Sequence, residues 1–364
     1  MATVTASQVG DITNFYLENF MQDKWADAVR PYQQYITATE LFTKRRERDD
    51  ASERVSFNLK VNEADNTVAD SFFKEDTINR VDLGIKGEVK WHFQKTHFSV
   101  DNREPAMLSG SKTRILRYLD MMKSDMYDGF FKKNENWLWS LPAAPNDGTA
   151  GDPLPLGIPY WIVQSATAAF GFNGQHPTNY SDVGNVSSIT YDQWRNGTFT
   201  YASMSNADFC KKLSEALDKC DFDAPYPMAG EEVPSRNYGL YSTYKPFQDY
   251  QDLLYASNDD IGEDMGRYRG GRPQVGIGKQ TFRGVPWCWV PALDKSTSPA
   301  YDSNNPVYGI NWDTFSLRTY GDIFMRRAKA INLHNAHNTV VEWMDTGYQL
   351  CCRNRRSNFV GRAA

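Results

Sequence analysis

The segment of this sequence that comes closest to a nucleotide-binding motif is a short glycine-rich run, Gly276–Thr281 (GIGKQT). A phosphate-binding loop of the Walker type needs a glycine five residues before its last glycine, and a Ser or Thr directly after its lysine. Pro273 occupies the first of these positions and Gln280 the second. The run therefore predicts a turn that leads into a strand, without phosphate chemistry.

The histidines and cysteines give no metal-ligand or nucleophile pattern. His334 and His337 could share one helical face, but Asn335 stands where a zinc protease carries Glu, and no third ligand is indicated. The five cysteines are odd in number and unevenly spaced, which predicts reduced thiols, mostly buried, in place of a disulfide framework. No Gly-x-Ser-x-Gly elbow is present and no carboxylate pair stands out. We therefore expect no enzyme, no cofactor and no metal site.

Composition indicates a folded protein large enough for two or three packed units. The chain has 364 residues, 40% hydrophobic and 14% aromatic residues, and a formal net charge of −5. No apolar run reaches the roughly 18 to 20 residues that span a bilayer, and the residues from Met1 to Val4 do not begin a basic region followed by an apolar core, so we expect a cytoplasmic protein without membrane contact. The ten Trp and twenty Tyr suit either a packed interface or a sugar-binding platform.

Charge is distributed unevenly along the chain. Lys44–Arg54 holds five basic and four acidic residues, which is typical of a solvated or intersubunit face. Asp252–Asp264 holds five acidic residues and no Lys or Arg, but it lacks the EF-hand spacing and predicts a solvated loop. From Arg318 onward, eight basic residues stand against three acidic ones. That excess could face a polyanion, although an interfacial or solvated role explains it equally well.

Period-two alternation predicts a long two-stranded excursion in the first third of the chain. Val55–Val61 alternates apolar and polar residues, and a second stretch repeats the pattern at Val89, Trp91 and Phe93. A protruding hairpin cannot bury both faces alone, whereas another copy of the chain could cover it. We therefore predict intersubunit contacts at six residues: Val55, Phe57, Leu59, Val61, Trp91 and Phe93.

Helical periodicity predicts the remaining large elements. Asp11–Arg30 is amphipathic and ends before Pro31. The strongest helix carries apolar residues spaced by three or four, begins near Ser109 or Ser111, and ends by about Lys133, a length of about 34 Å. Two further helices are expected, one capped by Ser205 or Asn206 and one over Pro246–Ser257. The Pro- and Gly-rich stretch from 143 to 159 predicts a boundary between lobes.

Two apolar segments and their order resemble a known protein family. Phe282–Asp294 begins with a Gly-x-Pro step inside FRGVPWCWVPALD, a polar loop follows, and Pro306–Trp312 reads PVYGINW. Together with Tyr191–Tyr201, these segments resemble the major capsid proteins of tailed bacteriophages. The order of an N-terminal arm, an extended loop, a long helix and a central lobe resembles that family over most of the chain.

The resemblance implies an α+β, Hong Kong 97-like capsid fold. Its parts would be the N-terminal arm (1–51), the extended β-hairpin loop (52–105), the peripheral domain with its spine helix (106–149), the axial domain (150–279), and a return to the peripheral domain with C-terminal strands (280–364).

The same resemblance implies a function and a set of partners. The chain would assemble as hexamers and pentamers into an icosahedral shell around double-stranded DNA, bound without sequence specificity. A separate scaffolding protein and a portal would be partners, a decoration protein is a further candidate, and the mature location would be the virion, assembled in the host cytoplasm. The alternative from a different class is a carbohydrate-binding or carbohydrate-hydrolysing protein with aromatic platforms.

Overall fold

The computed structural model describes most of the chain: 36–49, 52–60, 84–101, 103, 112–143, 153–220, 237–257, 280–283, 285–294, 304–328, 331–333 and 336–364. Several sequence predictions lie outside these residues. They are the helix Asp11–Arg30, the hairpin residue Val61, the helix starts Ser109 and Ser111, most of the acidic segment Asp252–Asp264, the glycine-rich turn before Gln280, and His334.

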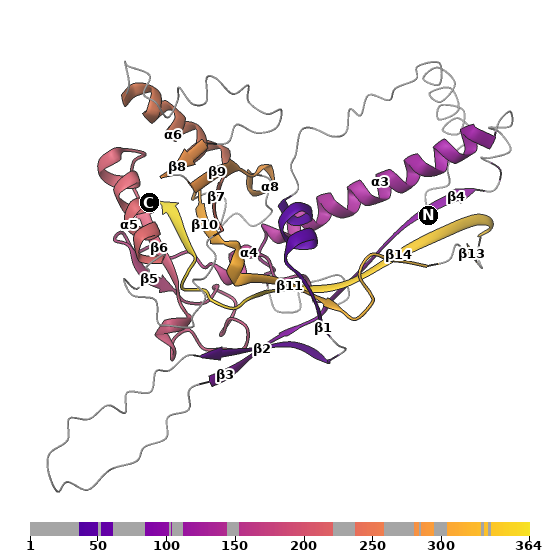
Figure 1. The fold of residues 1–364 in the computed structure, drawn as a ribbon, viewed down its shortest axis with the longest axis horizontal. Coiled ribbons are helices and arrows are strands. Elements are labelled where there is room, and N and C mark those ends of the chain that lie inside the picture. Colours follow the sequence, from indigo (N-terminus) through magenta and orange to yellow (C-terminus); the bar gives the residue numbers. More distant parts are fainter. Residues whose placement is uncertain are drawn as a thin grey trace, which may run out of the picture.

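A seven-stranded sheet forms the centre of one lobe, which we call the axial lobe. Its strands follow the order β5-β6-β15-β10-β7-β9-β8, so the C-terminal strand β15 lies between β6 and β10. Helices α5 and α6 lie beside this sheet (Figure 1). The bounds are β5 Gly171–Gly174, β6 Asn196–Tyr201, β7 Tyr238–Ser242, β8 Gln280–Phe282, β9 Val285–Trp289, β10 Val307–Asn311, β15 Phe359–Ala363, α5 Lys211–Cys220 and α6 Tyr244–Ser257.

A second sheet of six strands and the longest helix form the other lobe, which we call the peripheral lobe. Its strands run β1-β11-β14-β12, and β13 and β4 also pair with β14. Strand β14 is 17 residues long and extends beside helix α3 (Figure 1). The bounds are β1 Arg46–Asp49, β4 His92–Asp101, β11 Phe315–Tyr320, β12 Arg326–Arg327, β13 Ile331–Leu333, β14 Ala336–Cys352 and α3 Lys112–Leu138.

The long helix α3 is confirmed, but its predicted end near Lys133 is wrong. The helix continues through Asn134 to Leu138. The side chain of Asn134 does not stop it, because its amide donates a hydrogen bond to the carbonyl of Phe130 one turn earlier, at 2.8 Å. Met126 and Phe130, both on the predicted apolar stripe, are buried.

The predicted hairpin is present as strands β2 (Arg54–Lys60) and β3 (Gly84–Lys90), which pair antiparallel with Phe57 opposite Gly87. The sequence pattern joined Val89, Trp91 and Phe93 into one returning strand, and the structure divides them. Strand β3 ends at Lys90, and β4 begins at His92 and pairs with β14 over ten positions. The chain therefore changes sheets at Trp91.

The other predicted elements are present. Ser205 caps the turn before α5, where its hydroxyl accepts a hydrogen bond from the backbone N–H of Asp208. The segments around 285–290 and 306–312 form β9 and β10, and α6 covers the helix predicted over Pro246–Ser257. Short elements complete the fold: η1 Thr37–Phe42, α4 Ile158–Trp161, η3 Asp192–Trp194, η4 Asn206–Cys210, α8 Pro291–Asp294 and η5 Trp312–Thr314.

The boundaries of the five predicted segments stay a prediction. For the last segment, 280–364, the pairing of its strands can be compared with the predicted return to the peripheral domain. Strands β8, β9, β10 and β15 fall within 280–364, yet they pair in the axial sheet, whereas β11–β14 pair in the peripheral sheet. The C-terminal part of the chain therefore passes back and forth between the lobes.

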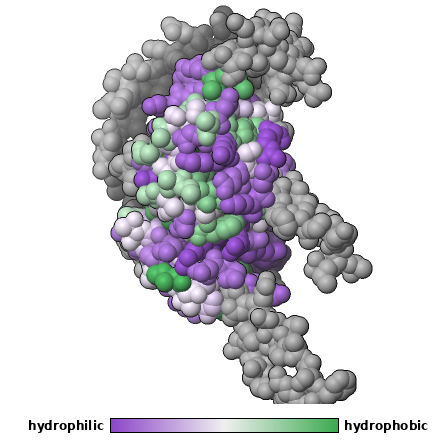
Figure 2. All heavy atoms as spheres, turned by 90° about the vertical axis from the view of Figure 1, so that its left-hand side faces the viewer, coloured by the Kyte–Doolittle hydropathy of each residue, from purple (hydrophilic) through white to green (hydrophobic). Residues whose placement is uncertain are grey.

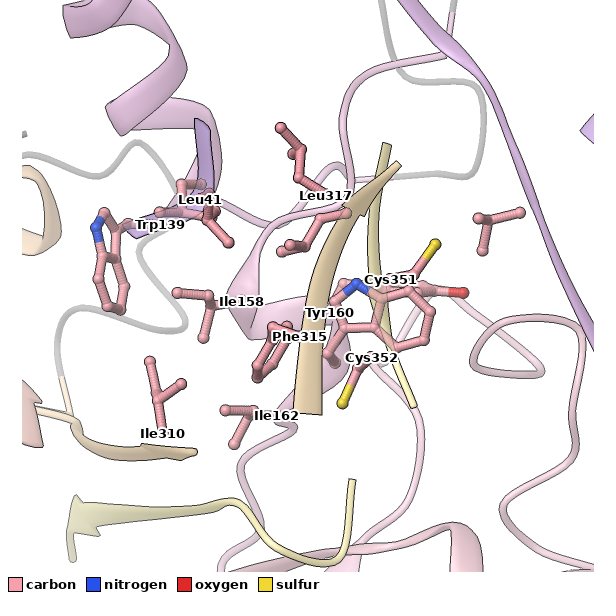
Figure 3. Close-up of a cluster of buried hydrophobic side chains, with 14 of the residues drawn as sticks. Leu41, Trp139, Ile158, Tyr160, Ile162, Ile310, Phe315, Leu317, Cys351 and Cys352 are labelled. Atoms are coloured by element: carbon pink, nitrogen blue, oxygen red, sulfur yellow. The ribbon is translucent and has the colours of Figure 1, made fainter. Parts of the chain in front are cut away.

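One large hydrophobic core joins the two lobes. Side chains from distant segments converge there, among them Leu41, Trp139, Ile310, Leu317 and Cys351 (Figure 3). A second core lies within the axial lobe, between its sheet and helices α5 and α6. Because the first core is continuous across the junction, the lobes are packed against each other.

The thiols differ from expectation in their burial. None of the five cysteines forms a disulfide, but only Cys351 and Cys352 are buried, and Cys210, Cys220 and Cys288 are partly exposed. Burial raises the pKa of the Cys352 thiol to about 12. In the described part of the chain, no helix is long and apolar enough to cross a membrane.

Candidate assembly surfaces

The described residues contain no group of three or more His, Cys, Asp or Glu side chains that could hold a metal ion. The ionisable groups with the largest pKa shifts are buried Tyr and Cys side chains and one buried Arg, and desolvation is the main cause for each. These groups belong to the core and are not gathered in a cleft. The candidate functional features are therefore surfaces and the packing that positions them.

The base of the β2–β3 hairpin is anchored to the body of the same chain. The Phe57 ring lies 6.0 Å from that of Trp161 and 6.3 Å from that of Trp194, measured between ring centres. Gly184, at φ +64°, provides room for this ring, because an added Cβ would lie 2.9 Å from it. The backbone N–H of Glu88 also donates to the carbonyl of Gly184, at 2.9 Å. These contacts fix the direction in which the hairpin leaves the body.

The structure places the six predicted contact residues in different environments. Four are buried within the subunit: Val55, Phe57, Leu59 and Trp91. Phe93 is 54% exposed, and its ring makes a T-shaped contact with that of Tyr320, with ring centres 5.3 Å apart. Val61 lies outside the described residues. Packing inside the chain accounts for the alternating pattern of the hairpin base, and the intersubunit role of all six stays a prediction.

One face of the β4–β14 pair carries a group of aromatic and cationic side chains near Phe93. The His97 ring stacks on Trp343 with ring centres 4.4 Å apart, and the Lys95 ammonium lies 5.8 Å from the same indole. Phe93, Lys95 and His97 alternate outward along β4. This exposed face is a candidate contact surface. Strand periodicity singled out Phe93 as a contact residue, but it gave no signal for Trp343.

The charged segment around β1 is paired within the chain. Glu47 accepts hydrogen-bonded ion pairs from Arg318 at 2.9 Å and from Arg353 at 2.6 Å, and Arg45 pairs with Asp313. Strand β1 also forms a parallel pair with β11. The charges that suggested a solvated or intersubunit face therefore hold the N-terminal strand to the peripheral sheet.

Arg355 is a structural residue that sequence reasoning missed. It was counted among basic residues that could face a polyanion, yet its side chain is fully buried. Its guanidinium donates to four backbone carbonyls and one side-chain oxygen: Trp161 O at 2.7 Å, Trp194 O at 2.6 Å, Gln175 O at 2.9 Å, Gly174 O at 3.1 Å and Asn196 Oδ1 at 3.1 Å. Burial lowers the pKa of this guanidinium to about 10. Arg355 thus ties the connection between β14 and β15 to the axial sheet.

Six of the ten tryptophans are buried and cannot contribute to a sugar-binding platform on the surface. Trp139, Trp161, Trp287 and Trp312 are among the largest fully buried side chains. Most of these indoles are bonded inside the core, as where Trp312 donates to the Tyr241 hydroxyl at 2.7 Å. The carbohydrate alternative was based on the number of aromatic residues, and the burial of most tryptophans removes that support.

Comparisons with solved structures find phage capsid chains over nearly the full length. A chain of the Cyanophage A-1(L) capsid asymmetric unit aligns with a TM-score of 0.61 and 12% identity, covering 96% of this chain and 98% of that one. A chain from the bacteriophage PhiM1 mature capsid aligns with a TM-score of 0.51, 10% identity, and coverage of 94% and 91%. A chain from the capsid of Myoviridae Phage XM1 aligns with a TM-score of 0.50 and 8% identity, covering 95% of this chain and 98% of that one.

This chain has the Hong Kong 97-like fold. The fold predicted from the resemblance is thus confirmed, with mixed helices and sheets, the long helix α3 and the hairpin base. Models of protein families give no match, and neither do curated proteins.

Proposed function

We propose that this chain is the major capsid protein of a tailed bacteriophage. The observation that supports the proposal most strongly is the likeness to the Cyanophage A-1(L) capsid chain, which extends over 96% of this chain and 98% of that chain. Because almost nothing is left over on either side, the likeness is one of whole chains and not of a single sheet or helix.

The physical features of the subunit support a role carried out by assembly. A hydrophobic core shared by the two lobes packs them against each other. The base of the hairpin is anchored to the same chain through Phe57, Trp161 and Trp194. A subunit in a closed shell touches several neighbours, so its buried area would exceed the roughly 1,600 Å² of a standard interface. Most of the shell's stability would then come from association.

In its finer form, the proposal includes hexamers and pentamers, an icosahedral shell, and sequence-independent contact with double-stranded DNA. A separate scaffolding protein and a portal would act with the coat protein, and a decoration protein is a further candidate. The mature location would be the virion after assembly in the host cytoplasm. The subunit's role would be structural, without catalysis, and the net charge of −5 would keep its DNA contact slight.

Expression of the chain alone tests this function. Size-exclusion chromatography should give a fraction far larger than 41.6 kDa. Negative-stain electron microscopy of that fraction should show closed shells, rings of five or six, or curved sheets. A stable monodisperse monomer at all concentrations, with or without a scaffolding protein, would contradict the proposal.

A further inference from the structure

Helix α3 buries one side in the peripheral lobe and exposes the other. Strands β4 and β14 run along one side of the helix (Figure 1), and Met126 and Phe130 of its apolar stripe are buried. Asp125, Gly129 and Lys133 are exposed. Residues four apart in a helix are neighbours on its surface, so these three residues form one line. We call this line the outer face of α3.

Gly129 has no structural explanation inside the subunit. Glycine in the interior of a helix lowers stability, because it loses more backbone freedom on folding than other residues do. An added Cβ at Gly129 would meet no atom of the described residues within 4 Å, so crowding does not require glycine there. Of the other described glycines, only Gly321 has such open surroundings, and its φ is +48°. Gly129 leaves room for a second helix to approach this backbone closely.

The charges on either side of Gly129 have opposite signs. Asp125 lies one turn before it and Lys133 one turn after it, each about 6 Å away along the helix axis. The Lys133 ammonium lies 5.1 Å from the centre of the Trp137 ring, which positions it without neutralising it. Neither Asp125 nor Lys133 forms an ion pair within the described part of the chain. Both charges are therefore available to a partner.

This outer face is complementary to itself. When two copies of α3 cross in opposite directions at Gly129, a two-fold axis places Asp125 of one copy beside Lys133 of the other. The same axis generates a second, identical ion pair, because both copies use the same surface. A parallel crossing would instead bring like charges together. The order of acid, glycine and base thus selects the antiparallel arrangement.

We propose that two copies of this chain pair through the outer face of α3, antiparallel about a two-fold axis at Gly129, with two Asp125–Lys133 ion pairs. This inference rests on the proposed function, because it names one contact between subunits of a shell. The axial end of the subunit, shown in Figure 2, is mostly hydrophilic, with hydrophobic residues in small separate areas. The described residues of that end therefore offer no large apolar patch that would mark a competing contact.

Disulfide trapping tests the geometry. Two cysteines can be bridged when their Cα atoms are about 4.4–6.8 Å apart. In particles of the Gly129→Cys variant, the two introduced thiols meet at the axis, so mild oxidation should give a covalent dimer and no larger species on a non-reducing gel. Asp125→Cys is the matched control, because its thiols would lie about 12 Å apart along the helices. The wild type sets the background, since Cys210, Cys220 and Cys288 are partly exposed.

Charge reversal tests the ion pairs. Asp125→Lys and Lys133→Glu each place like charges together at both pairs, and each should raise the subunit concentration needed for half-maximal assembly about tenfold or more. The chain that carries both substitutions restores opposite charges and should assemble nearly as well as the wild type. Lys211→Glu, at an exposed position of α5, changes the net charge as Lys133→Glu does and should assemble normally.

The Gly129→Leu variant separates assembly from folding. Leucine favours a helix more than glycine does and the position is open, so the soluble variant subunit should unfold at the same temperature as the wild type or at a higher one. Its side chain would hold the two helices apart, so assembly should weaken as in the single charge variants. Normal assembly of this variant would overturn the inference.

The outcomes separate this contact from the proposed function. Failure of the wild-type chain to assemble would contradict the proposed function and this contact with it. Assembly of the wild type without a covalent dimer from Gly129→Cys would overturn the α3 contact alone. Loss of assembly in the single charge variants without recovery in the double variant would do the same, and so would an equal loss in Lys211→Glu.

Discussion

Replacing Arg355 by Lys tests how the two lobes are held together. The buried guanidinium donates to five acceptors in the axial lobe, none of which is a carboxylate. Lysine keeps the positive charge but has three donors on a point-like ammonium, so at least two of the five hydrogen bonds are lost.

The size of the effect follows from the hydrogen bonds that are lost. A hydrogen bond to a charged group contributes about 1.5–3 kcal/mol. Loss of two such bonds, partly relieved by a shift of neighbouring residues, should destabilise Arg355→Lys by about 3 kcal/mol. Because a typical protein is stable by about 5–15 kcal/mol, the variant should fold but with a large loss.

Urea unfolding of the soluble subunit, followed by tryptophan fluorescence, measures this loss. For a slope of about 3 kcal/mol per M, the midpoint should fall by about 1 M. Arg356→Lys is the matched control, since the neighbouring side chain is exposed above Phe172 and the expected change is within about 0.5 kcal/mol. Equal midpoints for the two variants would refute the structural role of Arg355.

Three further predictions follow from burial and charge. Phe93→Asp should reduce assembly without changing the thermal unfolding midpoint, whereas Phe57→Asp should lower that midpoint strongly, because Phe57 is buried against two tryptophans. An unchanged particle yield for Phe93→Asp would remove the β4–β14 face from the assembly contacts. Cys351 and Cys352 should resist iodoacetamide at pH 8 in the native subunit, since burial raises the pKa of both thiols, and mass spectrometry should find them modified only after unfolding; rapid native modification would contradict their burial. A hydrogen bond from Lys212, one turn later, lowers the pKa of Asp208 below its usual 3.8. The ionised carboxylate therefore stabilises the fold at pH values above 3.8, and this stabilisation is lost as the pH falls through the lower pKa of the folded state. The Asp208→Asn variant should therefore have a lower free energy of unfolding than the wild type at pH 6, and the difference should be smaller at pH 2. A difference that stays the same at low pH would contradict the stabilising role of this carboxylate.

Much of the element order was predictable because local patterns dictate it. The period-two alternation at Val55–Lys60 predicts a strand, and the apolar stripe through Met126 and Phe130 predicts the long helix. Ser205 gives a cap signal that the structure satisfies. These features depend on neighbours within a few residues, which a single sequence displays.

The rest depends on partners far apart in the chain. Alternation shows that Phe57 faces an apolar surface, but it does not tell whether Trp161 of the same chain or another copy supplies that surface. Arg355 looks like any other basic residue, because its acceptors are backbone carbonyls, which carry no sequence signal. The end of α3 was misplaced because Asn134 bonds back to its own helix.

A cryo-electron microscopy reconstruction of the particles formed by this chain would test its assignment as a shell subunit most directly. The account predicts closed particles with five-fold and six-fold clusters of copies, in which the segment between β2 and β3 lies on a neighbouring subunit. A chain that stays monomeric at high concentration and with a scaffolding protein, or particles in which that segment contacts no neighbour, would contradict it.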